Sequence, residues 1–190
     1  MKVFVFDLDG TLVNSVEIHA KAFKDAVKKL GFKNYNKLYK EFKKYVGLPL
    51  EKILENILPN LDKSSIEKIK KLKEYYFLKN IDKVKPIKKA IEFLKEIKEK
   101  GYKTAIFSSS PKKIVKKLLK KFKLEKYFDY IVSKEDVKKG KPNPEGLIKI
   151  MKKFKTKELI FIGDSKYDKL ACKALKCKFI HISKIDKFKI

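Results

Sequence analysis

The chain has 190 residues, 44% of them hydrophobic, and a formal net charge of +27 at pH 7. This composition is typical of a globular protein, and the length suits one domain or one domain with an insert. No segment approaches the roughly 18 consecutive apolar residues of a membrane span, and the N-terminal residues lack the features of a signal peptide. We therefore expect a cytoplasmic protein without a membrane partner.

All 50 basic residues are lysines, and they recur in nearly every segment of the chain. Most fall on the outward faces of amphipathic patterns, which favours a solvated surface over a dedicated nucleic-acid-binding surface. Heat adaptation and an A/T-rich codon bias would both enrich lysine, and the sequence does not separate them. The positive field nevertheless favours phosphorylated anions as partners.

The first expected element is the apolar strand KVFVFDL, at residues 2–8. A helix follows, with Asn14 or Ser15 as its N-cap and Gly31 at its end. Further helical patterns cover residues 35–46, 50–58 and 63–80. Because no strand pattern lies among them, residues 14–82 are predicted to form an all-α block.

After Pro86 the chain alternates between helices and strands, beginning with a helix whose apolar face starts at Ile87 and which ends at Gly101. Strands are expected at 102–108, 127–133, 158–164 and 178–183, and helices at 111–122, 145–154 and 166–175. This alternation predicts an α/β fold with a Rossmann-like parallel sheet covered by helices on both faces. The core would comprise residues 1–13 and 83–190, and residues 14–82 would be an inserted helical cap domain.

Two acidic clusters end two of these strands. Asp7 and Asp9 follow the first strand, where their carboxylates would point into one small volume and repel each other unless a cation lies between them. Asp164 ends a later strand, and Asp168 lies one helical turn beyond it. Asp164 as a plain helix N-cap is the alternative. Hard oxygen ligands without a thiolate or histidine pair favour Mg²⁺ over Zn²⁺.

Two further polar residues lie where ligands bind in parallel sheets. Ser108 ends a strand and could bind a phosphoryl oxygen, whereas Ser110 is expected only to cap the helix that starts at Pro111. Lys141 lies between Gly140 and Pro142, which fix the backbone and aim the ammonium.

Other residues are less informative. His19 is expected on a helix surface or at a hinge, with acid/base chemistry as the alternative, and His181 is expected in the core. Gly47 belongs to a turn or to a cap loop that faces the substrate. Cys172 and Cys177 are expected to be free, small hydrophobic side chains, with a disulfide as the alternative.

The order of these motifs resembles the haloacid-dehalogenase-like phosphohydrolase superfamily, in the branch with a helical cap that includes phosphoglycolate phosphatase and β-phosphoglucomutase. The matching stretches are FDLDGT, the strand-ending Ser108, GKPNPE and GDSKYD, together with NSVEIHAKAF in the cap. Lys176 departs from the pattern, because relatives commonly have glycine there.

The resemblance implies roles for these residues. Asp7 would be the nucleophile that forms an aspartyl-phosphate, and Asp9 the general acid and base. Mg²⁺ would be held by Asp7, Asp9 and Asp164, with Asp168 orienting the ligands. Phosphoryl oxygens would be bound by Ser108, Ser109, Lys141 and Thr11. An acid at position 9 favours phosphoryl transfer, because dehalogenases of the superfamily lack it.

The predicted function is a Mg²⁺-dependent phosphatase for a small phosphorylated metabolite, such as phosphoglycolate or a sugar phosphate. A phosphomutase is the alternative within enzymes, and a nucleotide or nucleic-acid end stays open as substrate. A lysine-rich nucleic-acid-binding protein with an inactive fold is the alternative of another class. We expect a monomer or a small homo-oligomer.

Overall fold

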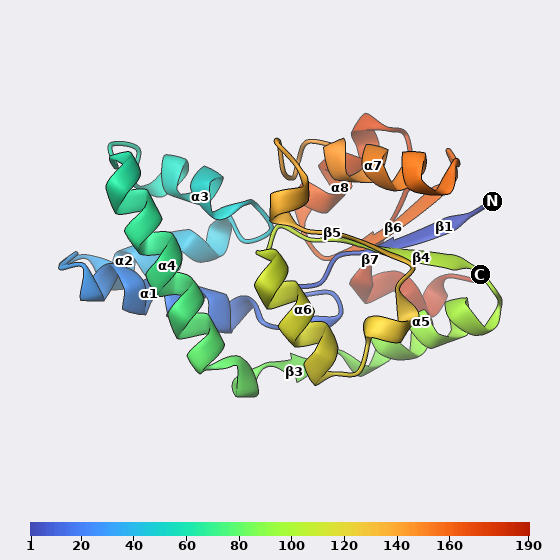
Figure 1. Cartoon of the computed structure of the whole chain (residues 1–190), viewed down its shortest axis with the longest axis horizontal. Coiled ribbons are helices and arrows are strands. Elements are labelled where there is room, and N and C mark those ends of the chain that lie inside the picture. Colours follow the sequence, from blue (N-terminus) through green and yellow to red (C-terminus); the bar gives the residue numbers. More distant parts are fainter.

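A five-stranded parallel sheet forms the centre of the larger part of the molecule (Figure 1). The computed structural model describes residues 1–190. The strands lie in the order β5-β4-β1-β6-β7. Their bounds are β1 Val3–Phe6, β4 Lys103–Phe107, β5 Tyr130–Val132, β6 Leu159–Gly163 and β7 Lys178–His181. The parallel sheet predicted from the sequence is confirmed.

Helices cover both faces of this sheet, as Figure 1 shows. Alternate side chains of β1 point to opposite faces, so Phe4 and Phe6 join one buried cluster while Val3 and Val5 join another. All four are fully buried, and each contributes about 1.5–3 kcal/mol to folding. The helices are α5 Lys88–Glu99 and α6 Lys112–Lys121 on the phenylalanine face, and α7 Glu145–Phe154 and α8 Lys166–Ala174 on the valine face.

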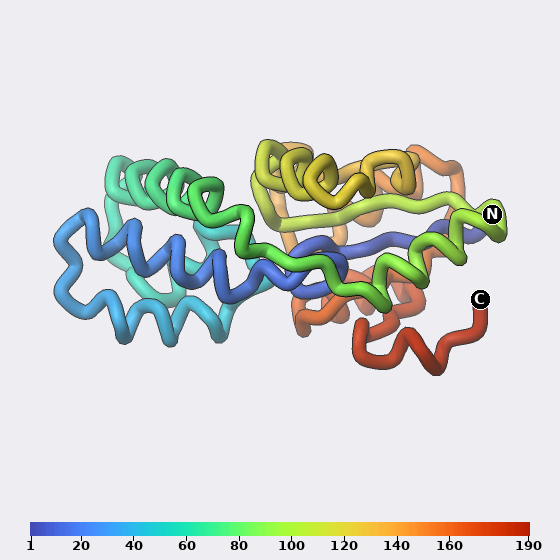
Figure 2. Tube along the Cα trace, turned by 90° about the horizontal axis from the view of Figure 1, so that it is seen from below, coloured from blue at the N-terminus to red at the C-terminus, as the bar shows by residue number.

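The helical block lies beside the carboxyl ends of the strands and has a buried cluster of its own (Figure 2). Its helices are α1 Val16–Lys29, α2 Tyr35–Lys44, α3 Leu50–Ile57 and α4 Lys63–Lys79. All four predicted helices are confirmed, with ends within two residues of the expected ones. None of the helices is both long and apolar enough to cross a membrane.

The chain passes between the sheet and the helical block twice, and the two connecting segments lie side by side. β2 (Val13–Asn14) pairs antiparallel with β3 (Lys85–Pro86). No sequence pattern predicted this pair, because two-residue strands are too short to show a periodic pattern. Short 3₁₀ helices complete the structure at Ile81–Lys83, Glu125–Tyr127, Lys134–Asp136 and Ile182–Lys187.

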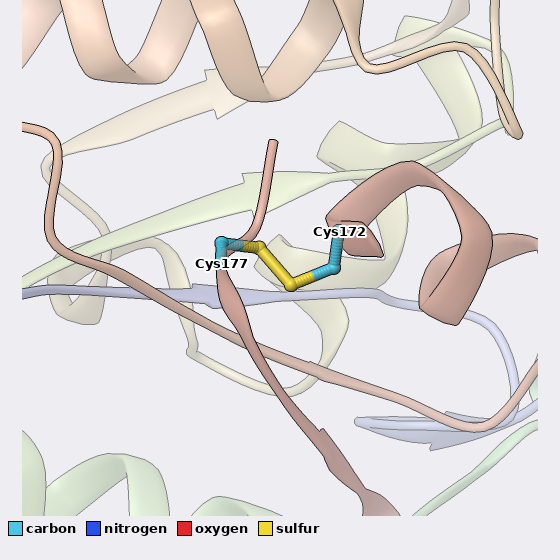
Figure 3. Close-up of a disulfide and its surroundings, with 2 residues drawn as sticks. All are labelled: Cys172 and Cys177. Carbon is cyan, nitrogen blue, oxygen red and sulfur yellow. A yellow bond between two sulfur atoms is a disulfide. The ribbon is translucent and has the colours of Figure 1, made fainter. Parts of the chain in front are cut away.

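Cys172 and Cys177 form a disulfide (Figure 3), so the expectation of two free thiols is wrong. Lys176, the residue before Cys177, adopts a left-handed conformation with φ 54° and turns the chain back after α8. The two Cα atoms therefore lie 5.1 Å apart, within the range that a disulfide spans. A reversal of this kind is set by backbone conformation, which residue spacing did not indicate.

Candidate active site

Carboxylates from two adjacent strands converge at the carboxyl edge of the sheet. Asp7 follows β1, Asp164 follows β6, and β1 pairs directly with β6. Oxygen atoms of Asp7, Asp164 and Asp168 all lie within 4.8 Å of one another. The sequence predicted this convergence from the positions at which the strands end. The alternative of Asp164 as a helix N-cap is wrong, because Ser165 caps α8 and Asp168 completes the capping box.

Lys141 reaches the same carboxylates from the loop before α7. Its ammonium lies 2.6 Å from Asp7 Oδ1 and 2.7 Å from Asp168 Oδ1, and the side chain is only 1% exposed. Burial alone would lower the pKa of Lys141, but the carboxylates of Asp168 and Asp7 outweigh burial and raise that pKa above its usual value. The Lys141 ammonium therefore stays charged next to Asp7.

The cluster formed by Asp7, Asp164, Asp168 and Lys141 has three acidic side chains and one basic side chain. Burial raises the pKa of Asp7 well above its usual value, and repulsion from Asp168, Asp164 and Asp9 adds to the effect against the opposing charge of Lys141. Burial and Asp168 likewise raise the pKa of Asp164. Asp168 Oδ1 accepts no hydrogen bond of good geometry, and the nearest charged group to it is the Lys141 ammonium. An all-oxygen, acceptor-rich set of this kind fits a hard divalent cation.

The turn after β1 places the backbone against Asp164. Gly10 has φ +86°, and a Cβ there would come within 2.3 Å of Asp164 Oδ2, so only glycine fits. The Thr11 hydroxyl donates to Asp164 Oδ1 at 3.0 Å. Thr11, which we expected to contact phosphate, therefore orients Asp164 in this arrangement.

His181 also contacts Asp164, which corrects its expected place in the core. The side chain is half-buried, and its Nε2 lies 3.0 Å from the Asp164 carbonyl. Nδ1 accepts from the Ser183 N–H at 3.2 Å, so Nε2 bears the proton and donates to that carbonyl. No pattern in the sequence indicated this contact, because it depends on the pairing of β6 with β7 in the folded sheet.

Three donors surround Asp9. Ser15 and Ser110 donate their hydroxyls to Asp9 at 2.5 Å and 2.6 Å, and His19 Nε2 lies 3.0 Å away. Burial by itself would raise the pKa of Asp9, but His19, Ser110 and Ser15 lower it well below the usual value. Asp9 is therefore held ionised.

These contacts correct three expectations. Ser15 occupies the N-cap position of α1, but its hydroxyl makes no capping bond and is directed to Asp9. Ser110 is not the cap of α6, because Pro111 takes that position. His19 is not on a helix surface, since it is only 5% exposed. All three side chains instead contact the carboxylate of Asp9, just after the first strand.

Lys73 of α4 is the residue that the sequence analysis missed. Its ammonium lies 3.1 Å from His19 Nδ1, and it is 8% exposed. An ammonium can only donate, so Nδ1 accepts and Nε2 carries the proton that His19 donates to Asp9. Burial and Lys73 lower the pKa of His19, which keeps the ring neutral. The signal was the spacing of Ile69, Lys73 and Phe77, the three buried positions of α4, which lie four residues apart.

Serines after β4 connect the sheet to the helical block. Ser108 is buried, and its hydroxyl accepts from the Ser110 N–H at 3.0 Å. Ser109 donates to the Gly47 carbonyl at 2.8 Å, so its hydroxyl is engaged by the helical block in this arrangement. Gly47 has φ +105°, and a Cβ there would lie 2.8 Å from Ser165 Oγ. The predicted phosphate-binding roles of Ser108 and Ser109 stay predictions.

A cavity of about 640 Å³ lies between the helical block and these strand ends. Asp7 and Asp9 line it on the sheet side, and Lys73 lines it on the side of α4. Two ion pairs that involve lining residues join the helical block to the core, with Lys134 bound to Glu51 and Lys113 bound to Glu74 at 2.9 Å. The volume is large enough for a small phosphorylated molecule.

Comparison with known proteins agrees with this geometry. A family model described as haloacid dehalogenase-like hydrolase matches residues 4–182. Phosphoglycolate phosphatase from Aquifex aeolicus is 30% identical over 171 residues, which cover 88% of this chain and 78% of that protein. Pyrophosphatase PpaX from Halalkalibacterium halodurans is 32% identical over 171 residues, which cover 89% of this chain and 77% of that protein.

Solved structures show the same fold. A hydrolase from Pseudomonas syringae superposes with a TM-score of 0.85 at 24% identity, covering 95% of this chain and 84% of that one. The predicted fold class, a Rossmann-like sheet with helices on both faces and additional helices beside it, is thus confirmed.

Proposed function

Because the chain belongs to the haloacid dehalogenase-like hydrolase family and is one of its phosphatases, we propose that it is a Mg²⁺-dependent enzyme that hydrolyses a small phosphorylated metabolite through an aspartyl-phosphate at Asp7. The observation that carries the proposal is the contact between Asp7 and the buried ammonium of Lys141. A carboxylate oxygen of Asp7 also lies within 4.8 Å of one of Asp164. Residues far apart in sequence meet there, and Asp7 lines the cavity.

In the first step a carboxylate oxygen of Asp7 attacks phosphorus, and the bond from phosphorus to the leaving-group oxygen breaks. Asp9 is ionised in the free protein, so it takes up one proton when the anionic substrate binds beside it and then gives that proton to the leaving-group oxygen. In the second step Asp9 takes a proton from a water that attacks the phosphoryl group, which releases inorganic phosphate and restores Asp7. The donors around Asp9 favour its ionised form, as the second step requires.

Repulsion between Asp7 and an anionic substrate opposes the first step. Lys141 offsets part of this repulsion, since its ammonium lies 2.6 Å from the attacking carboxylate. Asp7 and Asp164, with the Asp9 carbonyl, would hold Mg²⁺, and Asp168 keeps Lys141 in place at 2.7 Å. When bound, the cation supplies further positive charge at the phosphoryl oxygens.

The names of the relatives suggest phosphoglycolate and pyrophosphate as the first substrates to test, with sugar phosphates beside them. The experiment is a phosphate-release screen over such metabolites, with and without Mg²⁺, in which Asp7→Asn is the blank. We expect Mg²⁺-dependent release that Asp7→Asn abolishes. Release that survives Asp7→Asn would overturn the proposal.

A further inference from the structure

Lys73 is a buried cation without an anionic partner. Of the other lysines that line the cavity, Lys70, Lys113 and Lys134 pair with glutamates. The remaining two, Lys71 and Lys79, are exposed to solvent. Lys73 forms no ion pair, and its ammonium contacts only the neutral ring of His19 and the face of Phe42, at 5.7 Å from the ring centre. An unpaired buried charge is unfavourable, and burial lowers the pKa of Lys73 to about 8. A bound anion would supply the missing partner.

Lys73 lies close to Asp9, the residue next to which the leaving group would be bound. His19 bridges Lys73 and Asp9, at 3.1 Å and 3.0 Å from its two ring nitrogens. Asp9 is the residue that, under the proposed function, protonates the leaving-group oxygen. The Lys73 ammonium therefore lies one imidazole ring away from Asp9, and Lys73 and Asp9 line the same cavity. This distance suits the far end of a leaving group only a few atoms long.

We propose that Lys73 binds an anionic group carried by the leaving group. The preferred substrates are then phosphoryl compounds whose leaving group has a negative charge of its own, a carboxylate or a second phosphate. Sugar phosphates, whose leaving groups are neutral, are poorer substrates. This inference rests on the proposed function and narrows its substrate class.

A purely structural role explains Lys73 less well. The residue occupies the central position of the buried stripe formed with Ile69 and Phe77, where an apolar side chain would pack without burying a charge. Its hydrogen bond to His19 fixes the ring, but a neutral donor would do the same. The charge of Lys73 also helps to keep the His19 ring neutral, but burial of the ring is the larger cause of its lowered pKa. A bound anion accounts for the ammonium more directly.

The test compares two substrates of nearly equal size, 2-phosphoglycolate and 2-hydroxyethyl phosphate, which differ in the carboxylate. Lys73→Gln removes the charge and keeps a donor for His19, and Lys73→Met removes both. The control is Lys71→Met, which changes an exposed lysine on the same helix that also lines the cavity. A thermal melting curve of each variant would check that the variant is folded.

We expect the unmodified enzyme to prefer 2-phosphoglycolate. Lys73→Gln and Lys73→Met should lower kcat/KM for it by about 10- to 100-fold, the range for a hydrogen bond to a charged group. For 2-hydroxyethyl phosphate the change should stay within about threefold. Lys71→Met should leave the ratio between the two substrates unchanged. An equal loss for both substrates, or the same loss in Lys71→Met, would overturn the inference.

A binding measurement separates this inference from the proposed function. Calorimetry with 2-phosphoglycolate on Asp7→Asn and on Asp7→Asn combined with Lys73→Gln requires no turnover. Weaker binding in the double variant supports the Lys73 site, and equal binding contradicts it. Absence of phosphate release from every substrate, together with Lys73-dependent binding, would contradict the proposed function alone.

Discussion

Lys73→Met is predicted to stabilise the free protein at pH 7. The pKa of Lys73 falls from 10.5 to about 8 in the folded protein, chiefly because burial disfavours the charged form. Since one pKa unit corresponds to 1.36 kcal/mol, keeping the ammonium protonated in the folded state costs about 3 kcal/mol. Losing the hydrogen bond to His19 offsets about 1 kcal/mol of the gain, so the net increase in unfolding free energy is about 2 kcal/mol.

The sign of the pH dependence follows from the lowered pKa. Between about pH 8 and pH 10.5 the unfolded chain binds a proton at Lys73 that the folded chain has lost. The stability of the unmodified protein therefore rises through this window relative to Lys73→Met. The advantage of the variant is complete below pH 8 and disappears toward pH 10.5. Other lysines and tyrosines titrate in both proteins and cancel in the difference.

Urea unfolding followed by circular dichroism at pH 7, 8, 9 and 10, in buffer without phosphate or sulfate, measures this difference. Lys71→Met serves as the matched control, because Lys71 is exposed and its change should be within about 0.5 kcal/mol at every pH. A stability difference between the unmodified protein and Lys73→Met that does not vary with pH would refute the reasoning, because Lys73 would then titrate alike in both states.

Three further perturbations test the site. EDTA should reduce phosphate release to the level of Asp7→Asn, and added Mg²⁺ should restore it; activity that persists in EDTA would contradict the metal site. Gly10→Ala places a Cβ 2.3 Å from Asp164 Oδ2 and should weaken Mg²⁺ activation by about 10-fold or more, read from Mg²⁺ titrations of activity. An unchanged titration would mean that Asp164 is not a ligand. Ser110→Ala removes a donor to ionised Asp9 and raises its pKa, so the acidic limb of the kcat profile should move to higher pH. A limb that stays in place would show that the titration of Asp9 does not control turnover.

The sequence was sufficient for features that depend on strand ends. In a parallel sheet all carboxyl ends lie on one edge, so carboxylates that directly follow apolar strands must meet. Asp7 and Asp164 are such residues, and the structure brings them together. Lys141 was predicted from its place at the mouth of a helix, where the prolines that follow it restrict the backbone.

Contacts between the helical block and the sheet were not predictable in this way. His19 contacts Asp9, and Lys73 contacts His19, only because α1 and α4 pack beside the strand ends. Helical periodicity does not specify that packing. Ser110 has the sequence context of a helix cap, and only the closeness of Asp9 shows its other use. The disulfide depended on a left-handed residue that is not glycine.

The central claim is that Asp7 becomes phosphorylated during turnover. Enzyme quenched in acid while it hydrolyses 2-phosphoglycolate can be digested and mapped by mass spectrometry. We expect the added mass of one phosphoryl group on the peptide that contains Asp7, and no such mass in Asp7→Asn. Steady turnover with no phosphoryl group on that peptide, or with the group on another residue, would contradict the account.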